Sequence, residues 1–369
     1  MISHTTNTLR VVSVGLAVTA AALGVRIAAQ PSKAAKEHVT VSPNESAKRV
    51  DISIAGRPFT SYRWDASLKK PVLYPLRSAS GTIVTRGWPL EPRPGERVDH
   101  PHQVGLWLNY GDVNGLDFWG NSDEIKPEEA PKKGTIVHRG VVTAQGGADS
   151  GTLTADMDWT SARGDVLLHE RTTFVFRGDD TTRSVDRMTT LTAAGSRVVF
   201  NDTKEGMFGL RVARQLEQPS TTPEVFTDAA GNATAVPVLD NTGITGLYTS
   251  SQGKTGDDVW GTRSPWMMLR GRIGGHPVTL AILDHPRNPG YPTYWHARGY
   301  GLFAANPLGR ASFTDGRQPP FTLTVEPNTA VTFRYRLLII DGQASADTIE
   351  REAHVFQQVS TVKSQGSRN

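Results

Sequence analysis

Hydrophobic and polar residues alternate with a period of two along most of the chain, which is typical of β-strands that bury one face. Residues 49–64 (RVDISIAGRPFTSYRW) predict two strands joined by a tight turn at residues 55–56. Residues 151–193 predict consecutive long antiparallel strands that turn at residues 162–164 and 178–180. The chain contains 36 glycines and 23 prolines, which supply frequent turns. We therefore expect an all-β fold, a single large antiparallel β-sandwich of the supersandwich type, with two smaller sandwiches as the alternative.

One helix is predicted close to the C-terminus. Asp347 can cap it, with Glu350 three residues later, and Ile349, Ala353 and Phe356 form an apolar stripe. This stripe is expected to pack against the sandwich.

The N-terminus has the pattern of a secretory signal peptide. Arg10 precedes an uncharged apolar run at residues 11–25, and the small residues Ala28 and Ala29 follow. The run is shorter than the about 20 residues of a membrane-spanning helix, although an uncleaved anchor remains the alternative. We expect an exported protein, periplasmic or extracellular, that has no membrane contact after cleavage.

These patterns divide the chain into four predicted parts: a signal peptide at residues 1–29, a polar linker at 30–48, one β-sandwich domain with the C-terminal helix at 49–359, and a disordered tail at 360–369.

Composition excludes several classes of function. The chain has no cysteine, so it has no disulfide, thiolate metal ligand or cysteine nucleophile. Its 40 basic and 36 acidic residues are interspersed, which leaves no basic stripe for nucleic acid. The motifs G-x-x-x-x-G-K, G-x-S-x-G and H-E-x-x-H do not occur, so no nucleotide cofactor is expected and neither a serine esterase nor a helical zinc protease is favoured.

Two segments share an Asp-His-Pro triplet: residues 98–120 (VDHPHQVGLWLNYGDVNGLDFWG) and residues 283–307 (LDHPRNPGYPTYWHARGYGLFAANP). They contain four of the ten histidines, namely His100, His102, His285 and His296. In an extended strand, His100 and His102 project to the same face, and Pro101 between them favours a strand start, an edge or a turn. Imidazoles at this spacing suit metal ligation or proton transfer, whereas each could instead hydrogen-bond a local turn.

Acidic, amide and aromatic residues crowd the same segments. Glycines next to Asx residues favour a structured loop, and such residues are also ordinary turn formers. Tryptophans offer flat faces to the C–H side of a sugar ring, although core packing is the usual role of each one. A third segment, residues 198–213 (VVFNDTKEGMFGLRVA), places a base and an acid side by side in a loop. The candidate substrate-binding residues are Trp107, Asn109, Asp112, Asn114, Trp119, Lys204, Arg211, Trp295 and Arg298.

The ordered series of these motifs, from residue 98 to residue 356, resembles a bacterial family of uncertain function that is called "methane oxygenase PmoA" or PmoA-like. The resemblance implies a large β-sandwich from bacteria that degrade complex glycans, similar in overall character to the galactose-mutarotase-like sandwiches. The chain departs from the family pattern at Gln103-Val104, where a His-Arg pair is common. A methane oxygenase subunit is a multi-span membrane protein, whereas this chain has one short apolar segment.

We therefore expect an exported carbohydrate-active enzyme that cleaves or isomerises a glycoside by histidine and carboxylate proton transfer on a carbohydrate or other small polar substrate. The candidate catalytic residues are His100, His102, Glu205, Asp284, His285 and His296. The cofactor is unknown; a divalent metal is one option, held in that case by His100, His102 and His285. The alternatives are a non-catalytic glycan-binding protein and a metal-dependent oxygenase.

Overall fold

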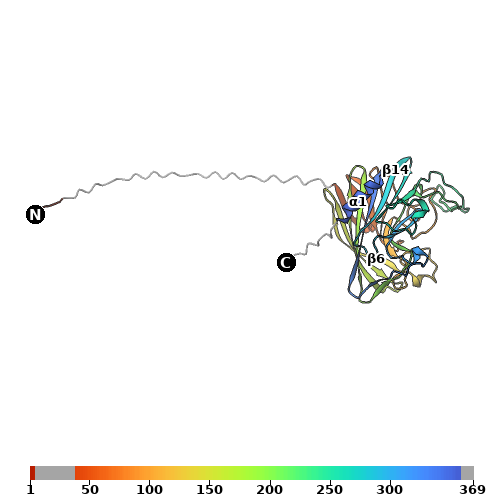
Figure 1. The fold of residues 1–369 in the computed structure, drawn as a ribbon, viewed down its shortest axis with the longest axis horizontal. Coiled ribbons are helices and arrows are strands. Elements are labelled where there is room, and N and C mark those ends of the chain that lie inside the picture. Colours follow the sequence, from red (N-terminus) through yellow and green to blue (C-terminus); the bar gives the residue numbers. More distant parts are fainter. Residues whose placement is uncertain (5–37, 359–369) are drawn as a thin grey trace. The chain divides into compact units, whose positions relative to one another are not determined.

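Alternating side chains build two eight-stranded antiparallel sheets, which are drawn in Figure 1. The computed structural model describes residues 1–4 and 38–358, and the chain divides into two units, Met1–Ala35 and Lys36–Asn369. The sheets belong to the second unit. The predicted cleavage region of the signal peptide and the predicted tail at residues 360–369 lie outside the described residues.

The first sheet combines strands from the beginning, middle and end of the second unit. Its order is β1 (Val39–Asn44), β2 (Arg49–Ile54), β3 (Arg57–Arg63), β4 (Val72–Leu73), β5 (Leu106–Tyr110), β11 (Gly206–Arg211), β16 (Leu302–Asn306) and β15 (Tyr294–Arg298).

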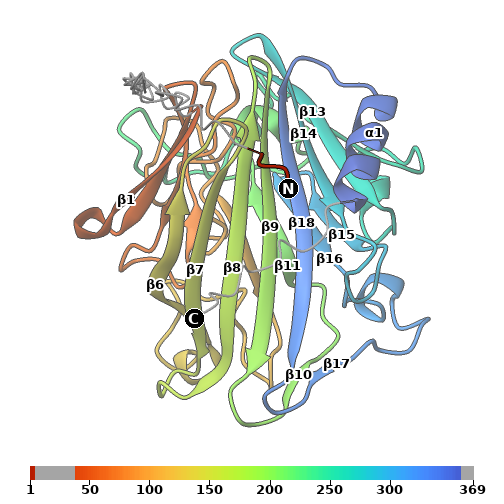
Figure 2. The same cartoon turned by 90° about the vertical axis from the view of Figure 1, so that its left-hand side faces the viewer.

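The second sheet is built mostly from long consecutive hairpins, which Figure 2 shows face-on. Its order is β12 (Leu247–Ser250), β13 (Trp266–Ile273), β14 (His276–Asp284), β18 (Ala330–Asp341), β9 (Thr182–Ala193), β8 (Val166–Gly178), β7 (Gly151–Thr160) and β6 (Thr135–Gln145). A small sheet pairs β10 (Val198–Phe200) with β17 (Leu323–Val325). The 3-10 helices are η1 (Glu45–Ala47), η2 (Ala130–Lys132), η3 (Arg214–Leu216), η4 (Gly256–Val259) and η5 (Ser312–Thr314).

The predicted all-β sandwich with a C-terminal helix is confirmed. Each sheet contains strands from both halves of the chain, so the alternative of two smaller sandwiches is wrong. The predicted turns also form, because β2 meets β3 across residues 55–56 and β7, β8 and β9 are consecutive neighbours. The predicted linker needs a correction: residues 39–44 form β1, which pairs with β2 along its whole length.

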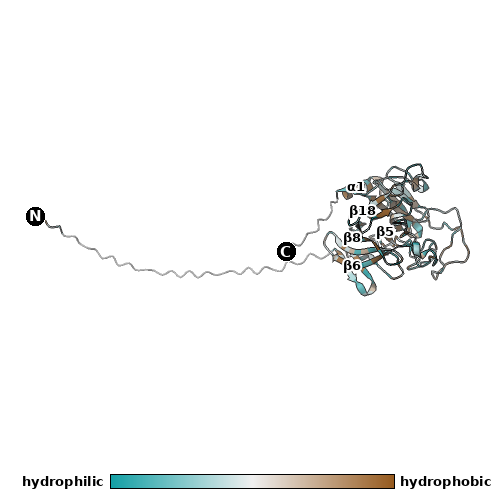
Figure 3. Cartoon of the chain, turned by 90° about the horizontal axis from the view of Figure 1, so that it is seen from below, coloured by the Kyte–Doolittle hydropathy of each residue, from teal (hydrophilic) through white to brown (hydrophobic). Residues whose placement is uncertain are grey.

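The main core lies between the two sheets. Along β7 the core positions are Leu153, Ala155, Met157 and Trp159, and the residues between them are half-buried. Hydrophobic and hydrophilic residues therefore alternate along the strands (Figure 3). Full burial of one large apolar side chain contributes about 1.5–3 kcal/mol, so this alternation fixes which face of each strand points inward.

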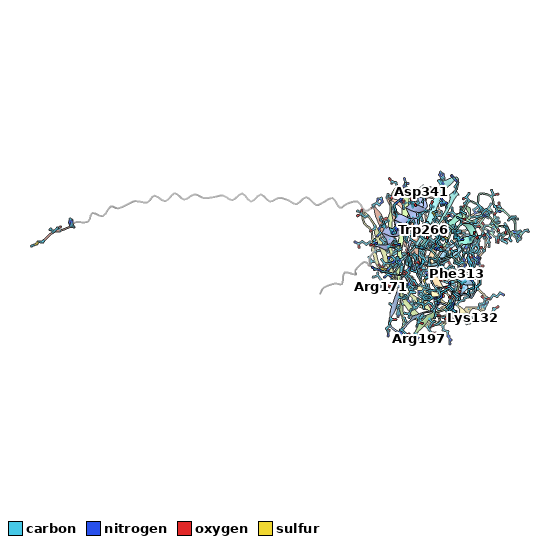
Figure 4. All side chains as sticks on the ribbon, viewed as in Figure 1. Lys132, Arg171, Arg197, Trp266, Phe313 and Asp341 are labelled. Carbon is cyan, nitrogen blue, oxygen red and sulfur yellow. The ribbon has the colours of Figure 1, made fainter. Side chains whose placement is uncertain are left out.

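The helix α1 (Ala346–Gln357) covers part of the outer face of the second sheet (Figure 2). Its predicted stripe is buried against Trp266, which is labelled in Figure 4, and against other outward residues of β13, β14 and β18. The predicted cap is wrong, because Ser345 rather than Asp347 accepts a hydrogen bond from the backbone N–H of Thr348. A short hydroxyl at the residue before the helix suits this role.

None of the described helices is long and apolar enough to cross a membrane.

Candidate active site

A cavity of about 740 Å³ opens on the outer face of the first sheet, above β5, β11, β16 and β15. Strand β15 shows how the side chains reach it. Trp295 and Ala297 belong to the main core, so His296 and Arg298, which alternate with them, point to the opposite face. The other walls come from the loops that flank β5, β11 and η4. The polar and aromatic lining residues are Arg97, His100, His102, Gln103, Asp117, Trp119, Lys204, Glu205, Gln218, Ser220, Thr221, Glu224, Asp257, Trp260, His296, Arg298 and Tyr300.

One row of residues crosses four paired strands beneath the cavity: Trp107, Gly209, Ala304 and His296, of which His296 lines it. The glycine is required by packing, because a Cβ atom at Gly209 would lie 2.5 Å from Cζ2 of Trp107. Trp119 packs against Trp107 with ring centroids 5.3 Å apart and stacks near His296 at 6.3 Å. Two small residues in the middle of the row, Gly209 and Ala304, therefore leave room for the ring of Trp107, on which Trp119 packs.

Glu205 and His296 face each other across a gap. The distance from Nδ1 of His296 to Oε2 of Glu205 is 3.9 Å, and this Nδ1 is buried without a hydrogen-bond partner among the described residues. Lys204 pairs with the other carboxylate oxygen, Oε1. An oxygen atom about 2.8 Å from both groups fits this separation, so a ligand hydroxyl could hydrogen-bond to both.

The His296 ring is neutral at neutral pH. Burial lowers its pKa to about 3, and the charges of Arg298 and Lys204 act in the same direction. The ring of Phe313, a residue labelled in Figure 4, lies 6.0 Å from the His296 ring. A neutral imidazole can accept a proton or donate a hydrogen bond, according to its tautomer.

His102 is also held neutral. Burial lowers its pKa to about 2, with a further contribution from the charge of Lys70. Nζ of Lys70 donates to the carbonyl oxygen of His102 at 2.7 Å and lies 5.3 Å over the Trp107 ring. Burial lowers the pKa of Lys70 itself to about 7, although the charge of Asp117 opposes this change.

His100 is fixed in an uncommon backbone conformation. Its φ angle is +46°, in the left-handed region, which costs a non-glycine residue about 1–3 kcal/mol unless the surroundings enforce it. The ring stacks on Tyr300 at 4.7 Å with an interplanar angle of 7°, and Nδ1 lies 3.0 Å from Oδ2 of Asp99. Nη2 of Arg86 donates to the carbonyl oxygen of His100 at 3.0 Å. These contacts present the edge of the imidazole to the cavity.

A buried ionic cluster supports this wall from behind. Oδ1 of Asp99 lies 2.5 Å from Nη1 of Arg86 and 2.6 Å from Nη2 of Arg211. The Arg211 guanidinium also lies 4.8 Å under the Tyr300 ring. Burial raises the pKa of Glu217 to about 7, against the lowering effect of Arg211 and other arginines. Arg211 is fully buried, so it supports Tyr300 and is not placed to touch a ligand directly.

The cavity unites seven of the predicted site residues: His100, His102, Trp119, Lys204, Glu205, His296 and Arg298. They come from loops and strand ends that are far apart in the sequence.

Asp284 and His285 lie elsewhere, which corrects the expectation that both Asp-His-Pro triplets form one site. The His285 ring packs against Phe356 of α1, on the outer face of the second sheet. The Asp284 carboxylate accepts hydrogen bonds from Asn288 and from the backbone N–H of Thr293. It therefore braces the loop that leads into β15, and burial raises its pKa to about 7.

The remaining candidates have structural roles in the described fold. Trp107 lies under the cavity floor, and Trp295 donates to Ser264 within the core. Side-chain hydrogen bonds brace turns at the other three positions, which are Asn109, Asp112 and Asn114.

The residues do not fit the predicted metal site. His285 is separated from His100 and His102, and the described ranges, 1–4 and 38–358, contain no group of three or more His, Cys, Asp or Glu side chains that could hold a metal ion.

Sequence reasoning missed several residues of the site, chiefly Asp99, Gln218, Asp257, Trp260 and Tyr300. Asp99 adjoins His100, and Tyr300 follows His296 by four residues in the second quoted segment, so their proximity in the sequence was a usable signal. The other three come from loops near η3 and η4 that carry no motif, and only the fold brings them to β15.

The match to a known family covers most of the chain. Residues 49–354 match a family that is described as "Family of unknown function (DUF6807)". The chain belongs to the DUF6807 family. The motifs predicted membership of the PmoA-like family, and the family that matches is instead described as DUF6807. The expectation that the family has no established function is confirmed. No curated protein matches the chain.

Solved structures show a distant resemblance of this DUF6807 protein to carbohydrate-processing enzymes. The galactosidase domain of alpha-galactosidase-sucrose kinase AgaSK aligns with 10% identity and a TM-score of 0.34 over 82% of this chain and 42% of that chain. The chain thus spans less than half of that protein. A galactose mutarotase related enzyme from Lactobacillus acidophilus aligns with 6% identity and a TM-score of 0.31 over 83% of this chain and 99% of that chain. A galactose mutarotase-like protein from Clostridium acetobutylicum gives 10% identity, a TM-score of 0.26 and coverages of 83% and 99%.

Proposed function

We propose that this DUF6807 protein is a carbohydrate-active enzyme that transfers protons in the cavity on the first sheet, with Glu205 and His296 as the acid–base pair. One observation carries the proposal. The buried Nδ1 of His296 lacks a partner among the described residues and lies 3.9 Å from the free carboxylate oxygen of Glu205. A substrate hydroxyl between them would satisfy both groups.

The walls of the cavity support a sugar as the substrate. Trp119 and Trp260 contribute aromatic side chains to the lining, and Gln218 and Ser220 add polar groups beside them. Aromatic rings suit the C–H face of a sugar, and polar groups suit its hydroxyls. The volume of about 740 Å³ falls within the range of about 300–1,000 Å³ that is typical of small-molecule sites.

The chemistry favours isomerisation over hydrolysis. Hydrolysis of a glycoside commonly uses two carboxyl groups on opposite sides of the bond. Among the other lining carboxylates, Asp117 is bound to Lys133 at 2.7 Å, Glu224 is bound to Arg97 at 2.6 Å, and Asp257 accepts a hydrogen bond from Gln218 at 2.9 Å. Glu205 pairs with Lys204 through Oε1, and its other oxygen, Oε2, faces a neutral imidazole. We infer that Glu205 accepts the proton of the anomeric hydroxyl while His296 holds the same oxygen, that the bond between C1 and the ring oxygen breaks, and that the protonated Glu205 gives the proton to the ring oxygen; ring closure reverses these transfers.

The experiment is a turnover screen of the purified protein against aldoses, by NMR of anomer exchange, and against plant and algal glycosides, by product analysis. Each reaction is run with and without chelator. We expect Glu205→Gln and His296→Gln to lower kcat/KM by about 100-fold or more, because each removes one partner of the proton transfer. His169→Gln is the matched control, since His169 lies exposed on β8, where it contacts Asp158 of the second sheet.

The outcomes separate the alternatives. Turnover that survives both site variants would overturn the assignment of Glu205 and His296. Sugar binding without turnover would identify a glycan-binding protein. Loss of turnover in chelator would show a metal requirement, which the residues of the cavity do not explain.

We also propose that the protein acts outside the cytoplasm, in the periplasm or beyond. The apolar run at residues 11–25 and the small residues after it support this proposal.

A further inference from the structure

Arg298 is the one basic side chain of the cavity lining that forms no ion pair within the described part of the chain. Arg97 contacts Glu217 and Glu224, and Lys204 pairs with Glu205. The Arg298 guanidinium instead lies 4.9 Å over the ring of Trp260, at the edge of the cavity. Stacking on an indole orients the planar guanidinium but leaves its charge uncompensated and its N–H donors free.

The charges around the cavity histidines also indicate an excess of basic groups. After burial, the causes that lower the pKa of His296 are Arg298 and Lys204, and those that lower the pKa of His102 are Lys70 and further basic groups. Both imidazoles therefore lie within the influence of basic side chains. The carboxylate of Asp257, which also lines this edge, accepts a hydrogen bond from Nε2 of Gln218 at 2.9 Å.

We propose that the ligand of this cavity is a sugar that carries a carboxylate, a uronic acid residue, and that Arg298 binds this carboxylate. The proposal rests on the proposed carbohydrate function and names its substrate class. A guanidinium presents parallel N–H donors that match the two oxygens of a carboxylate. A neutral sugar would leave the charge of Arg298 unmatched.

The test compares pairs of sugars that differ only in the carboxylate. Binding of methyl glucuronide and methyl glucoside, and of the matching galacturonide and galactoside, to the full chain is measured by calorimetry at low and moderate salt. We expect at least one uronide to bind about tenfold or more tightly than its neutral partner, because a hydrogen bond to a charged group contributes this much. The preference should weaken as salt increases.

Substitutions assign the preference to one residue. In Arg298→Gln the ratio of the two dissociation constants should fall close to one, and Arg298→Lys should keep part of it because the charge remains. Arg310→Gln is the control, since Arg310 donates to the carbonyl oxygens of Pro319 and Pro320 and does not line the cavity. It should leave the ratio unchanged.

Equal binding of uronides and neutral sugars would overturn this proposal and leave the proposed function standing. An equal loss of affinity for both sugars in Arg298→Gln would also overturn this proposal and leave the proposed function standing, because Arg298 would then only pack against Trp260. Absence of binding to every sugar in the panel would overturn both proposals. Acetate is included as a competitor, and displacement of the uronide by acetate at similar concentration would show that the site binds simple carboxylates and not sugars.

Discussion

Replacing Asp99 by asparagine removes the negative charge that two buried arginines share. Oδ1 of Asp99 lies 2.5 Å from Nη1 of Arg86 and 2.6 Å from Nη2 of Arg211, and these arginine side chains are only 1% and 0% exposed. Breaking a buried ion pair costs about 3–5 kcal/mol, because the remaining charge is uncompensated. Asp99 itself is 19% exposed, which favours the lower end of that range. We therefore expect Asp99→Asn to lower the free energy of unfolding by about 3 kcal/mol.

Urea denaturation followed by tryptophan fluorescence measures this loss. The matched control is Asp156→Asn, because Asp156 and Arg171 form an equally short pair of 2.7 Å with side chains 36% and 63% exposed. An exposed pair contributes at most about 1 kcal/mol. Similar losses in the two variants would refute the role given to the buried cluster.

The loss of unfolding free energy in Asp99→Asn should also depend on pH. Burial alone would raise the pKa of Asp99, but Arg211, His100 and Arg86 together hold it well below its usual range. A carboxyl whose pKa is lower in the folded state stabilises the fold above its unfolded pKa of about 3.9, and this contribution is lost as pH falls toward the folded pKa. The difference between wild type and Asp99→Asn should thus be constant above about pH 5 and shrink below about pH 4. A difference that stays unchanged down to about pH 3 contradicts the assigned charge.

Two further predictions concern the cavity floor and the N-terminus. Gly209→Ala should lower the free energy of unfolding by about 1–3 kcal/mol in the same urea assay, because the new Cβ would lie 2.5 Å from Trp107. The control is Gly140→Ala, where no described atom lies within 4 Å of the new Cβ. Its loss of stability should be far smaller. N-terminal sequencing of the protein from its native host should begin close to residue 30, and an intact Met1 would contradict export with cleavage.

The fold was predictable because its causes are local. A period of two in β7, β8 and β9 specifies strands, and the short polar turns between them specify hairpins. The apolar stripe of α1 was also predictable from the sequence. Its cap was not, because Ser345 and Asp347 are both acceptable capping residues and only the backbone geometry selects between them. Strand β1 was missed because a short strand with three polar residues and a proline resembles a linker.

The two Asp-His-Pro triplets show where sequence reasoning ends. In the first, His100 takes a left-handed conformation and stacks on Tyr300 beside the cavity. In the second, His285 packs against the helix on the opposite sheet. The same three residues serve different purposes because β14, which ends at the second triplet, belongs to the second sheet, and the chain crosses to the first sheet before β15. Proximity in the sequence grouped His296 with Arg298 correctly, because the two residues share one strand face. It also grouped His296 with Asp284 and His285, and this grouping is wrong, because neither residue lines the cavity.

The sequence by itself determined the class of fold, the strand faces and the residue types able to transfer protons. The tertiary structure alone decided the partners of those residues. The order β5-β11-β16-β15 aligns Trp107, Gly209, Ala304 and His296 in one row and sets Glu205 opposite His296. Pairing between strands far apart in the sequence depends on the packing of the whole core, and no local pattern encodes it.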